Sequence, residues 1–106
     1  MLLENERRRR GLRRDVHIRI TFAGKEPGPI LLGKRDALEK RLSADKAGTA
    51  LRRTVGAGCL DIYVVTVDPA RTTEIAWKHV NELGLASRTT VRDEGVEPRR
   101  GAGASR

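Results

Sequence analysis

The sequence predicts an α+β fold in which an antiparallel sheet carries two helices on one face. Two segments, residues 16–23 and 60–67, have the β-branched content and the alternation that are typical of strands. Two others, residues 34–46 and 69–83, place apolar residues at helical spacing and charged residues between them. Stretches that contain Gly or Pro separate these segments, as expected of loops.

The strongest signal is the stretch of residues 59–85, which reads as a strand followed by a capped helix. Residues 60–67 (LDIYVVTV) are mostly apolar on both faces, which is typical of a central strand. Asp68 can accept hydrogen bonds from the first turn of the helix, and Pro69 suits the first helical position because its missing N–H is not needed there. Gly84 is expected to end this helix.

The first half of the chain predicts a strand, a turn and a helix. Residues 16–23 (VHIRITFA) alternate between apolar and polar side chains, which indicates a strand with one buried face. Pro27 and Gly28 fit the centre of a type II turn, because that turn needs a positive φ at its second central residue. A helix over residues 34–46 is expected next. An alternative makes residues 30–32 the return strand of a hairpin.

The second half adds two more strands around the central one. Residues 51–55 predict a weak strand, and residues 56–58 (GAG) predict a tight hairpin loop into the central strand. Arg52 and Arg53 suit an edge strand, because their charge discourages edge-to-edge association. Residues 87–93 (SRTTVRD) predict a short, polar last strand.

These elements follow one another as β-α-β-β-α-β, which is the order of the ferredoxin-like fold. In that fold the first and third strands are central, and here those two strands are the most apolar. We therefore expect a single ferredoxin-like α+β domain over residues 15–93. A basic arm over residues 1–14 and a disordered tail over residues 94–106 are expected to flank it.

The composition limits the possible partners and locations. The chain has 106 residues and a formal net charge of +8, and a basic balance favours anionic partners such as nucleic acid. The lone Cys59 excludes an intramolecular disulfide. No apolar run approaches the roughly 18 residues of a membrane span, and no signal-peptide core follows Met1. A cytoplasmic protein without a membrane partner is expected.

No group of residues in the sequence predicts a catalytic or metal site, and no cofactor is expected. The segment of residues 28–34 reads G-x-x-x-x-G-K but lacks the hydroxyl residue that a phosphate loop needs. Cys59 is interpreted as a small buried thiol, and Asp61 as an ion-pair partner of Arg19 or Arg53. A non-catalytic protein is therefore expected, although the question of an enzyme stays open.

The sheet face away from the helices is the expected binding surface. Its candidate residues mix arginines, one aromatic ring and a few smaller side chains: His17, Arg19, Tyr63, Val65, Arg88 and Arg92. The first hypothesis is that this face contacts a protein partner or forms a homodimer.

Two other functions compete with protein binding. In the first, Tyr63 stacks on a base of RNA or DNA while an arginine-rich arm holds phosphates. The arm residues are Arg7, Arg8, Arg9, Arg10, Arg13 and Arg14. Otherwise this arm is only a solvated terminus. In the second, a small enzyme acts on an anionic substrate beside Arg19 and His17.

Overall fold

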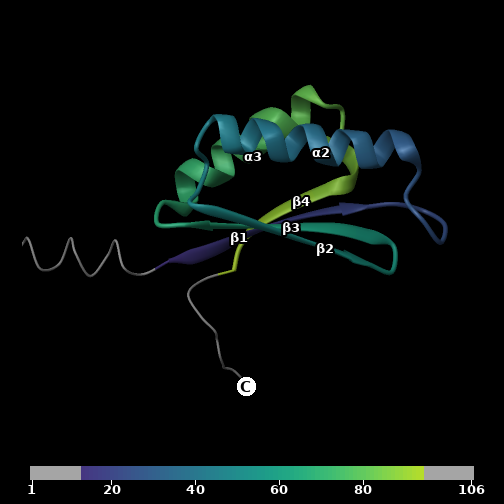
Figure 1. The fold of residues 1–106 in the computed structure, drawn as a ribbon, viewed down its shortest axis with the longest axis horizontal. Helices are drawn as coiled ribbons and strands as arrows, with labels where there is room; N and C mark the ends of the chain where they lie inside the picture. The colour runs from purple at the N-terminus through teal and green to yellow at the C-terminus, as the bar shows by residue number, and fades with distance from the viewer. Residues whose placement is uncertain (1–12, 95–106) are drawn as a thin grey trace, which may run out of the picture.

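The structure, a computed structural model, describes residues 13–94, and it has an α+β fold (Figure 1). Its elements are β1 (Arg14–Thr21), α2 (Pro29–Ala44), β2 (Ala50–Gly56), β3 (Cys59–Thr66), α3 (Pro69–Glu82), the short 3₁₀ helix η1 (Ala86–Arg88) and β4 (Thr89–Asp93). The four strands form one antiparallel sheet in the order β2-β3-β1-β4. Neither α2 nor α3 is long and apolar enough to cross a membrane.

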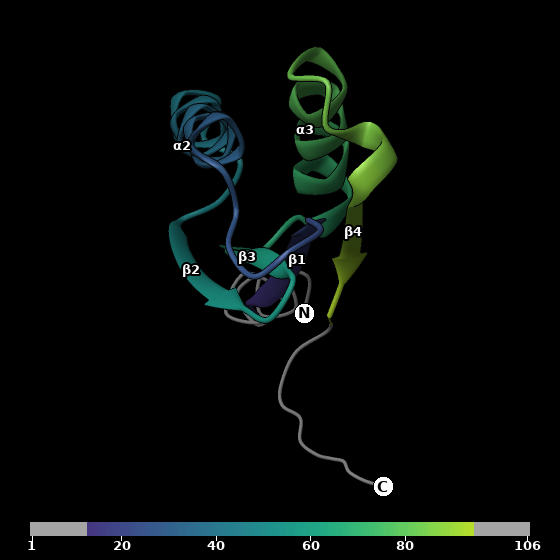
Figure 2. The ribbon, with the colours of Figure 1, turned by 90° about the vertical axis from the view of Figure 1, so that its right-hand side faces the viewer.

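Both helices lie on the same face of the sheet, as the sequence predicts. Seen from the end of the sheet, α2 lies above β2 and α3 lies above the side where β4 runs (Figure 2). No described helix or strand covers the opposite face, which we call the open face.

The core lies between the sheet and the two helices. Alternate residues of β1 and β3 point into it, and they are fully buried: Val16, Ile18, Ile20, Leu60, Ile62 and Val64. Leu38 and Leu42 of α2 and Ala76 and Val80 of α3 close the layer from above. The alternation of the two central strands therefore predicts their buried face correctly.

The start of α3 is formed as the sequence predicts. The side chain of Asp68 accepts a hydrogen bond from the backbone N–H of Arg71 at 3.2 Å, and Pro69 is the first helical residue. The helix ends at Glu82, and Gly84 follows with a φ of +73°. A glycine adopts this left-handed conformation without strain, so it ends the helix at low cost.

The prediction for the first helix was wrong at its start. α2 begins at Pro29 rather than at Lys34, because Pro29 occupies the first helical position and the helix then buries Leu31. A return strand over residues 30–32 is excluded, since these residues are helical. The type II turn is also wrong: Gly28 has an extended backbone with a φ of −73°, and the positive φ of this loop lies at Gly24.

The last strand is shorter than predicted. Arg88 belongs to η1, which closes with a hydrogen bond from the N–H of Arg88 to the carbonyl of Leu85. Leu85 is buried, so the chain turns once to place it before β4 begins at Thr89. The predicted hairpin between β2 and β3 is present, but its loop is shorter than the predicted residues 56–58, because Gly56 belongs to β2 and pairs with Cys59. Gly58 supplies the positive φ of the loop, +76°.

The loop between α2 and β2 packs tightly against β3. The N–H of Thr49 donates to the carbonyl of Val65 at 2.8 Å. At Gly48 an added Cβ would clash with the same carbonyl and would lie 2.6 Å from Cγ1 of Val64. Only a glycine allows this close approach, which fixes where β2 starts.

The chain enters β1 and leaves β4 at the same end of the sheet. Val16 lies opposite Asp93 in the pairing of these two strands. Next to this pair, Arg14 and Asp93 form an ion pair with a nitrogen-to-oxygen distance of 3.6 Å. The first and last strands of the fold are therefore joined where they meet the flanking residues.

Candidate binding face

The pairing of the strands arranges the open face in rows. One row crosses the four strands in order and consists of Arg52, Tyr63, His17 and Arg92. The adjacent row consists of Thr54, Asp61, Arg19 and Thr90. Within each row, side chains on neighbouring strands are close enough to contact one another. The two rows define the centre of the open face.

The carboxylate of Asp61 is the centre of a hydrogen-bond network on this face. Its Oδ1 accepts from Nε2 of His17 at 2.6 Å and from Nε of Arg19 at 2.8 Å. Its Oδ2 accepts from the Cys59 thiol at 3.4 Å. Only 5% of Asp61 is exposed, so the surrounding side chains replace the water that an aspartate otherwise needs.

This network keeps Asp61 charged. Burial by itself raises the pKa of Asp61, but the hydrogen bonds from its three neighbours outweigh burial, and its pKa lies below the usual value. The contact between Asp61 and Arg19 also raises the pKa of Arg19. Asp61 therefore stays ionised at neutral pH and holds Arg19 in place. This confirms the predicted pair of Asp61 with Arg19.

The thiol of Cys59 is held in its protonated form. Burial, followed by the hydrogen bond to the Asp61 carboxylate, raises the pKa of Cys59 above its usual value. Because the thiolate is the reactive form, this environment makes Cys59 a poor nucleophile. Cys59 is partly rather than fully buried, and in this respect the sequence interpretation was wrong.

Both flat surfaces of the Tyr63 ring are occupied. The His17 ring stacks on one surface, with ring centroids 4.4 Å apart and an interplanar angle of 8°. Arg52 comes from β2, on the opposite side of β3 from His17. Its guanidinium lies over the Tyr63 ring, 4.6 Å from the ring centroid. The row of three side chains thus stands on the sheet as a stack with its edges toward solvent.

The charges on the open face balance. Arg19 pairs with Asp61, Arg52 lies 3.9 Å from Asp15, and Arg92 lies 3.9 Å from Glu94. Glu94 also lies 3.3 Å from Nδ1 of His17, so both ring nitrogens of His17 face a carboxylate. The described part of the face therefore presents arginines and carboxylates in equal number.

The remaining predicted site residues are placed as follows. Val65 lies on the open face beside Ala50, one row from Tyr63, and is partly exposed. Arg88 does not stand in the row of Arg92, because it belongs to η1 and lines a small cavity with Lys34. Arg14 begins β1 and Arg13 precedes it. The other arm residues, Arg7, Arg8, Arg9 and Arg10, lie outside the described residues.

The arrangement does not form a catalytic relay. In a nucleophile–base pair, a histidine stands next to the nucleophile. Here Asp61 stands between His17 and Cys59, and the carboxylate accepts from both. Within residues 13–94, no three His, Cys, Asp or Glu side chains are grouped as ligands for a metal ion. The hydrogen bonds to Asp61 instead hold His17, Arg19 and Cys59 in fixed positions on the face.

A second network links the helices away from the open face. Nε2 of His79 donates to Oδ2 of Asp45 at 2.6 Å, and Arg71 donates to the backbone carbonyls of Asp45 and Lys46. The hydrogen bond from His79 lowers the pKa of Asp45. His79 is buried. These contacts fix α3 to the end of α2.

The sequence does not reveal the most important contacts of the face. Alternation predicts that His17, Asp61 and Tyr63 lie on one face but not which of them touch. A shorter hairpin loop than the predicted one was the available signal, because Gly56 pairs with Cys59 and this register places Arg52 opposite Tyr63. The predicted loop of residues 56–58 shifts this register by one residue and places Arg52 opposite Ile62. Compared with known proteins, the chain matches no protein-family model, no curated protein and no solved structure.

Proposed function

We propose that the chain is a small non-catalytic binding module of ferredoxin-like topology, which contacts another protein surface through its open face. The order of the elements and the sheet order β2-β3-β1-β4, with the first and third strands central, support this topology. The protein surface in question includes a second copy of this chain. Ferredoxin-like folds have many functions, so the proposal rests on the open face itself.

The observation that carries the proposal is the stack of Arg52, Tyr63 and His17 on a sheet face that no described helix or strand covers. Tyr and Arg are enriched where protein interfaces gain most of their binding energy, and Val65 adds an apolar contact beside the stack. His17 of the stack is already held in place by its hydrogen bond to Asp61, which also holds the neighbouring Arg19. A preorganised surface loses little conformational entropy on binding.

The balanced charges favour protein over nucleic acid as the partner. A phosphate backbone selects for basic groups that are free of carboxylates, whereas a protein surface can match both signs. Each open-face arginine in the two rows has a carboxylate within 4 Å, at Asp61, Asp15 or Glu94. In addition, a base can stack on Tyr63 only after Arg52 has moved away.

Nucleic-acid binding remains the second candidate, because the chain as a whole is strongly basic. In this case the arginine-rich arm supplies most of the phosphate contacts and the open face supplies few. Affinity would then fall steeply with salt, and removal of residues 1–14 would flatten that dependence. An enzyme acting on an anionic substrate beside Arg19 is the third candidate, and it needs an accessible His17, which is only 8% exposed.

The test compares proteins recovered on the immobilised full chain with those recovered on two variants. Val65→Asp introduces a charge into the open face, whereas Ile30→Asp makes the same chemical change at an exposed residue of α2. We expect Val65→Asp, and likewise Tyr63→Ala, to lose proteins that Ile30→Asp retains, with no effect of nuclease. Equal recovery on all variants would show that the open face is not an interface.

Light scattering with a short mixed-sequence RNA separates the first two candidates. We expect the mass of the full chain to be the same with and without RNA at moderate salt. A mass that rises with RNA at low salt and falls back to that of the chain alone at high salt would favour nucleic-acid binding over protein binding as the function.

A further inference from the structure

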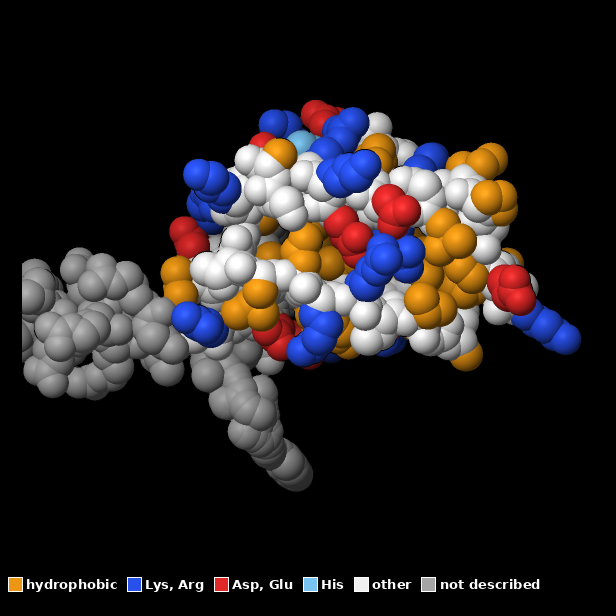
Figure 3. Space-filling view, in the orientation of Figure 1, with side chains coloured by type: hydrophobic (Ala, Val, Ile, Leu, Met, Phe, Trp, Pro, Cys, Tyr) orange, Lys and Arg blue, Asp and Glu red, His pale blue; other side chains and the backbone are white. Residues whose placement is uncertain are grey.

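The outer edge of β2 is a second surface that no helix or strand within residues 13–94 covers, and it is distinct from the open face. β2 lies at the end of the sheet, and its residues are exposed except for Leu51, which is half-buried. Val55 is 61% exposed. Beside this edge runs a groove of about 680 Å³ between α2 and β2, lined by Asp36, Glu39, Lys40, Ser43, Ala44, Leu51 and Arg53. Charged side chains gather over it, and hydrophobic side chains flank them (Figure 3).

The backbone groups that point outward from this edge can be identified. Phe22 donates its N–H to the carbonyl of Gly58, so the even-numbered residues of β3 bond to β1. The odd-numbered residues of β3 then bond to β2, where they meet even-numbered partners such as Arg52. The N–H and carbonyl groups of Leu51, Arg53 and Val55 therefore face away from the sheet.

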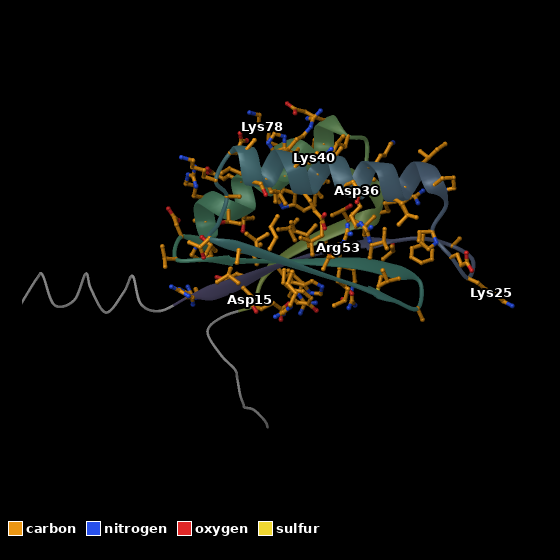
Figure 4. All side chains as sticks on the ribbon, viewed as in Figure 1. Asp15, Lys25, Asp36, Lys40, Arg53 and Lys78 are labelled. Atoms are coloured by element: carbon orange, nitrogen blue, oxygen red, sulfur yellow. The ribbon has the colours of Figure 1, made fainter. Side chains whose placement is uncertain are left out.

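Arg52 and Arg53 do not place free charges along this edge, although the sequence predicts that their charge discourages edge-to-edge association. Arg53 is turned upward from the sheet, where its Nη1 donates to Asp36 at 3.0 Å and to Glu39 at 3.2 Å (Figure 4). Arg52 is turned over Tyr63 on the open face. Since both charges are engaged within the chain, neither projects as a free charge over the edge to repel another strand.

We propose that β2 pairs with β2 of a second copy of this chain, antiparallel and about a two-fold axis at Arg53. This register uses every outward backbone group of Leu51, Arg53 and Val55, because Leu51 of one copy meets Val55 of the other. A two-fold axis shifted by one residue leaves some of these groups unpaired. The result is one continuous sheet made of the four strands of each copy.

The side chains around this axis complement one another. On the helix side of the sheet, Leu51 of one copy lies opposite Val55 of the other, which removes the exposed Val55 from water. Asp36 and Lys40 are one helical turn apart on α2, and Arg53 contacts the same part of the helix. An antiparallel second α2 therefore brings its Lys40 toward Asp36.

The opposed Arg53 side chains are the unfavourable feature of this pairing. Each of them already has two carboxylates, Asp36 and Glu39, within 3.2 Å. Together with Lys40, each copy contributes equal numbers of positive and negative charges at the axis. The repulsion between the two arginines is thus compensated.

The proposed dimer goes beyond the proposed function, since it uses a different surface. It leaves both open faces on the same side of the continuous sheet. A partner would then meet two copies of the stack of Arg52, Tyr63 and His17. The dimer can form even if the open face binds nothing, and the open face can bind even if the chain is monomeric.

The first test removes one outward N–H from the edge. Val55→Pro deletes a donor that does not bond to β3, and proline is accepted at such edge positions. Val55→Thr keeps the donor and the β-branched shape. Measured by sedimentation of the full chain over a range of concentrations, Val55→Pro is expected to raise the dissociation constant of the dimer about tenfold or more, and Val55→Thr much less.

The second test reads the register by cross-linking, in a Cys59→Ser background. Residues directly opposed in a hydrogen-bonded pair have Cα atoms about 5.5 Å apart, which suits a disulfide. Arg53→Cys is expected to form a disulfide-linked dimer under mild oxidation. Val55→Cys is not expected to form a disulfide-linked dimer, because residue 55 lies opposite Leu51 of the other copy.

Other outcomes would overturn the proposal. One is a chain that stays monomeric at all concentrations, and another is a dimer that Val65→Asp abolishes and Val55→Pro does not, which places the contact on the open face. If the chain is monomeric and the amides of Leu51, Arg53 and Val55 are still protected from hydrogen exchange, a segment of the same chain covers the edge.

Discussion

The ring of His17 stacks on the ring of Tyr63 while its Nε2 donates to the carboxylate of Asp61 at 2.6 Å. One side chain thus connects the aromatic stack of the open face with its charged network. Since His17 is nearly buried, it supports Tyr63 and Asp61 and contributes little surface of its own to the stack. The shape of the open face should therefore depend on the ionisation of Asp61.

Acid is expected to weaken the fold through Asp61. Its pKa is lower in the folded chain than in the unfolded one, where an aspartate titrates near pH 3.9. The stabilisation from ionised Asp61 is therefore complete above the pKa of the unfolded chain. It is lost as the pH falls through the lower pKa that Asp61 has in the folded chain. Urea unfolding at a series of pH values should show a steeper acid loss of stability for the wild type than for Asp61→Asn.

The same substitution has a cost at neutral pH. Asp61→Asn weakens the hydrogen bonds to His17 and Arg19, and about 1–3 kcal/mol of unfolding free energy should be lost. If Asp61→Asn and the wild type lose stability in parallel below pH 5, the Asp61 network does not contribute to acid sensitivity.

The contact between His79 and Asp45 should stabilise the packing of α3 against the end of α2. Asp45→Asn weakens the hydrogen bond to Nε2 of His79, and we expect a lower free energy of unfolding at pH 7. Glu74→Gln, an exposed change on the same helix, should alter stability by less than about 0.5 kcal/mol. Thermal or urea unfolding measures both variants, and equal effects would mean that the His79–Asp45 contact contributes nothing.

Two glycines should respond in opposite directions to alanine. Gly48→Ala places a Cβ against the carbonyl of Val65 and the side chain of Val64, and a loss of about 2–4 kcal/mol is expected. Gly33→Ala adds a Cβ in open space inside α2, where alanine favours the helix by about 0.5–1 kcal/mol. Urea unfolding of both variants checks the pair. A Gly48→Ala variant as stable as the wild type would contradict the tight packing of this loop.

Replacing the buried Arg35 by an apolar residue should stabilise the chain. Arg35 is only 8% exposed, its Nε has no hydrogen-bond partner among the described residues, and its contact with Asp36 is long at 3.4 Å. Arg35→Met keeps much of the volume and removes the desolvated charge, so stability should rise by about 1 kcal/mol. Arg35→Ala is the control, because it removes the charge and leaves a cavity as well. A clear loss of stability in Arg35→Met would indicate that the guanidinium forms a stabilising contact.

The parts of the fold that local chemistry decides were predictable from the sequence. Alternation identified the buried faces of β1 and β3, and Asp68 with Pro69 marked the start of α3. The start of α2 was missed because Ile30, next to Pro29, is apolar and yet 77% exposed, so the usual pattern of a core-facing helix is blurred there. The shortened β4 was missed because the burial of Leu85 decides where the chain turns.

The candidate site was predictable only in part. Alternation placed His17, Tyr63 and Arg19 on one face, since that depends on each strand alone. The contact between His17 and Asp61 joins residues 44 positions apart, so it depends on the register of two strands and on side-chain rotamers. Neither can be read from a single segment.

The adjacent ends of β1 and β4 determine how the domain responds to force. Because the chain enters and leaves at Arg14 and Asp93, pulling on the two flanking segments separates the β1–β4 pair from that end. The ladder bonds then break one after another instead of sharing the load, so the domain should unzip at low force. The same geometry suits insertion of the domain into a surface loop of another protein, because the host chain has little distance to span.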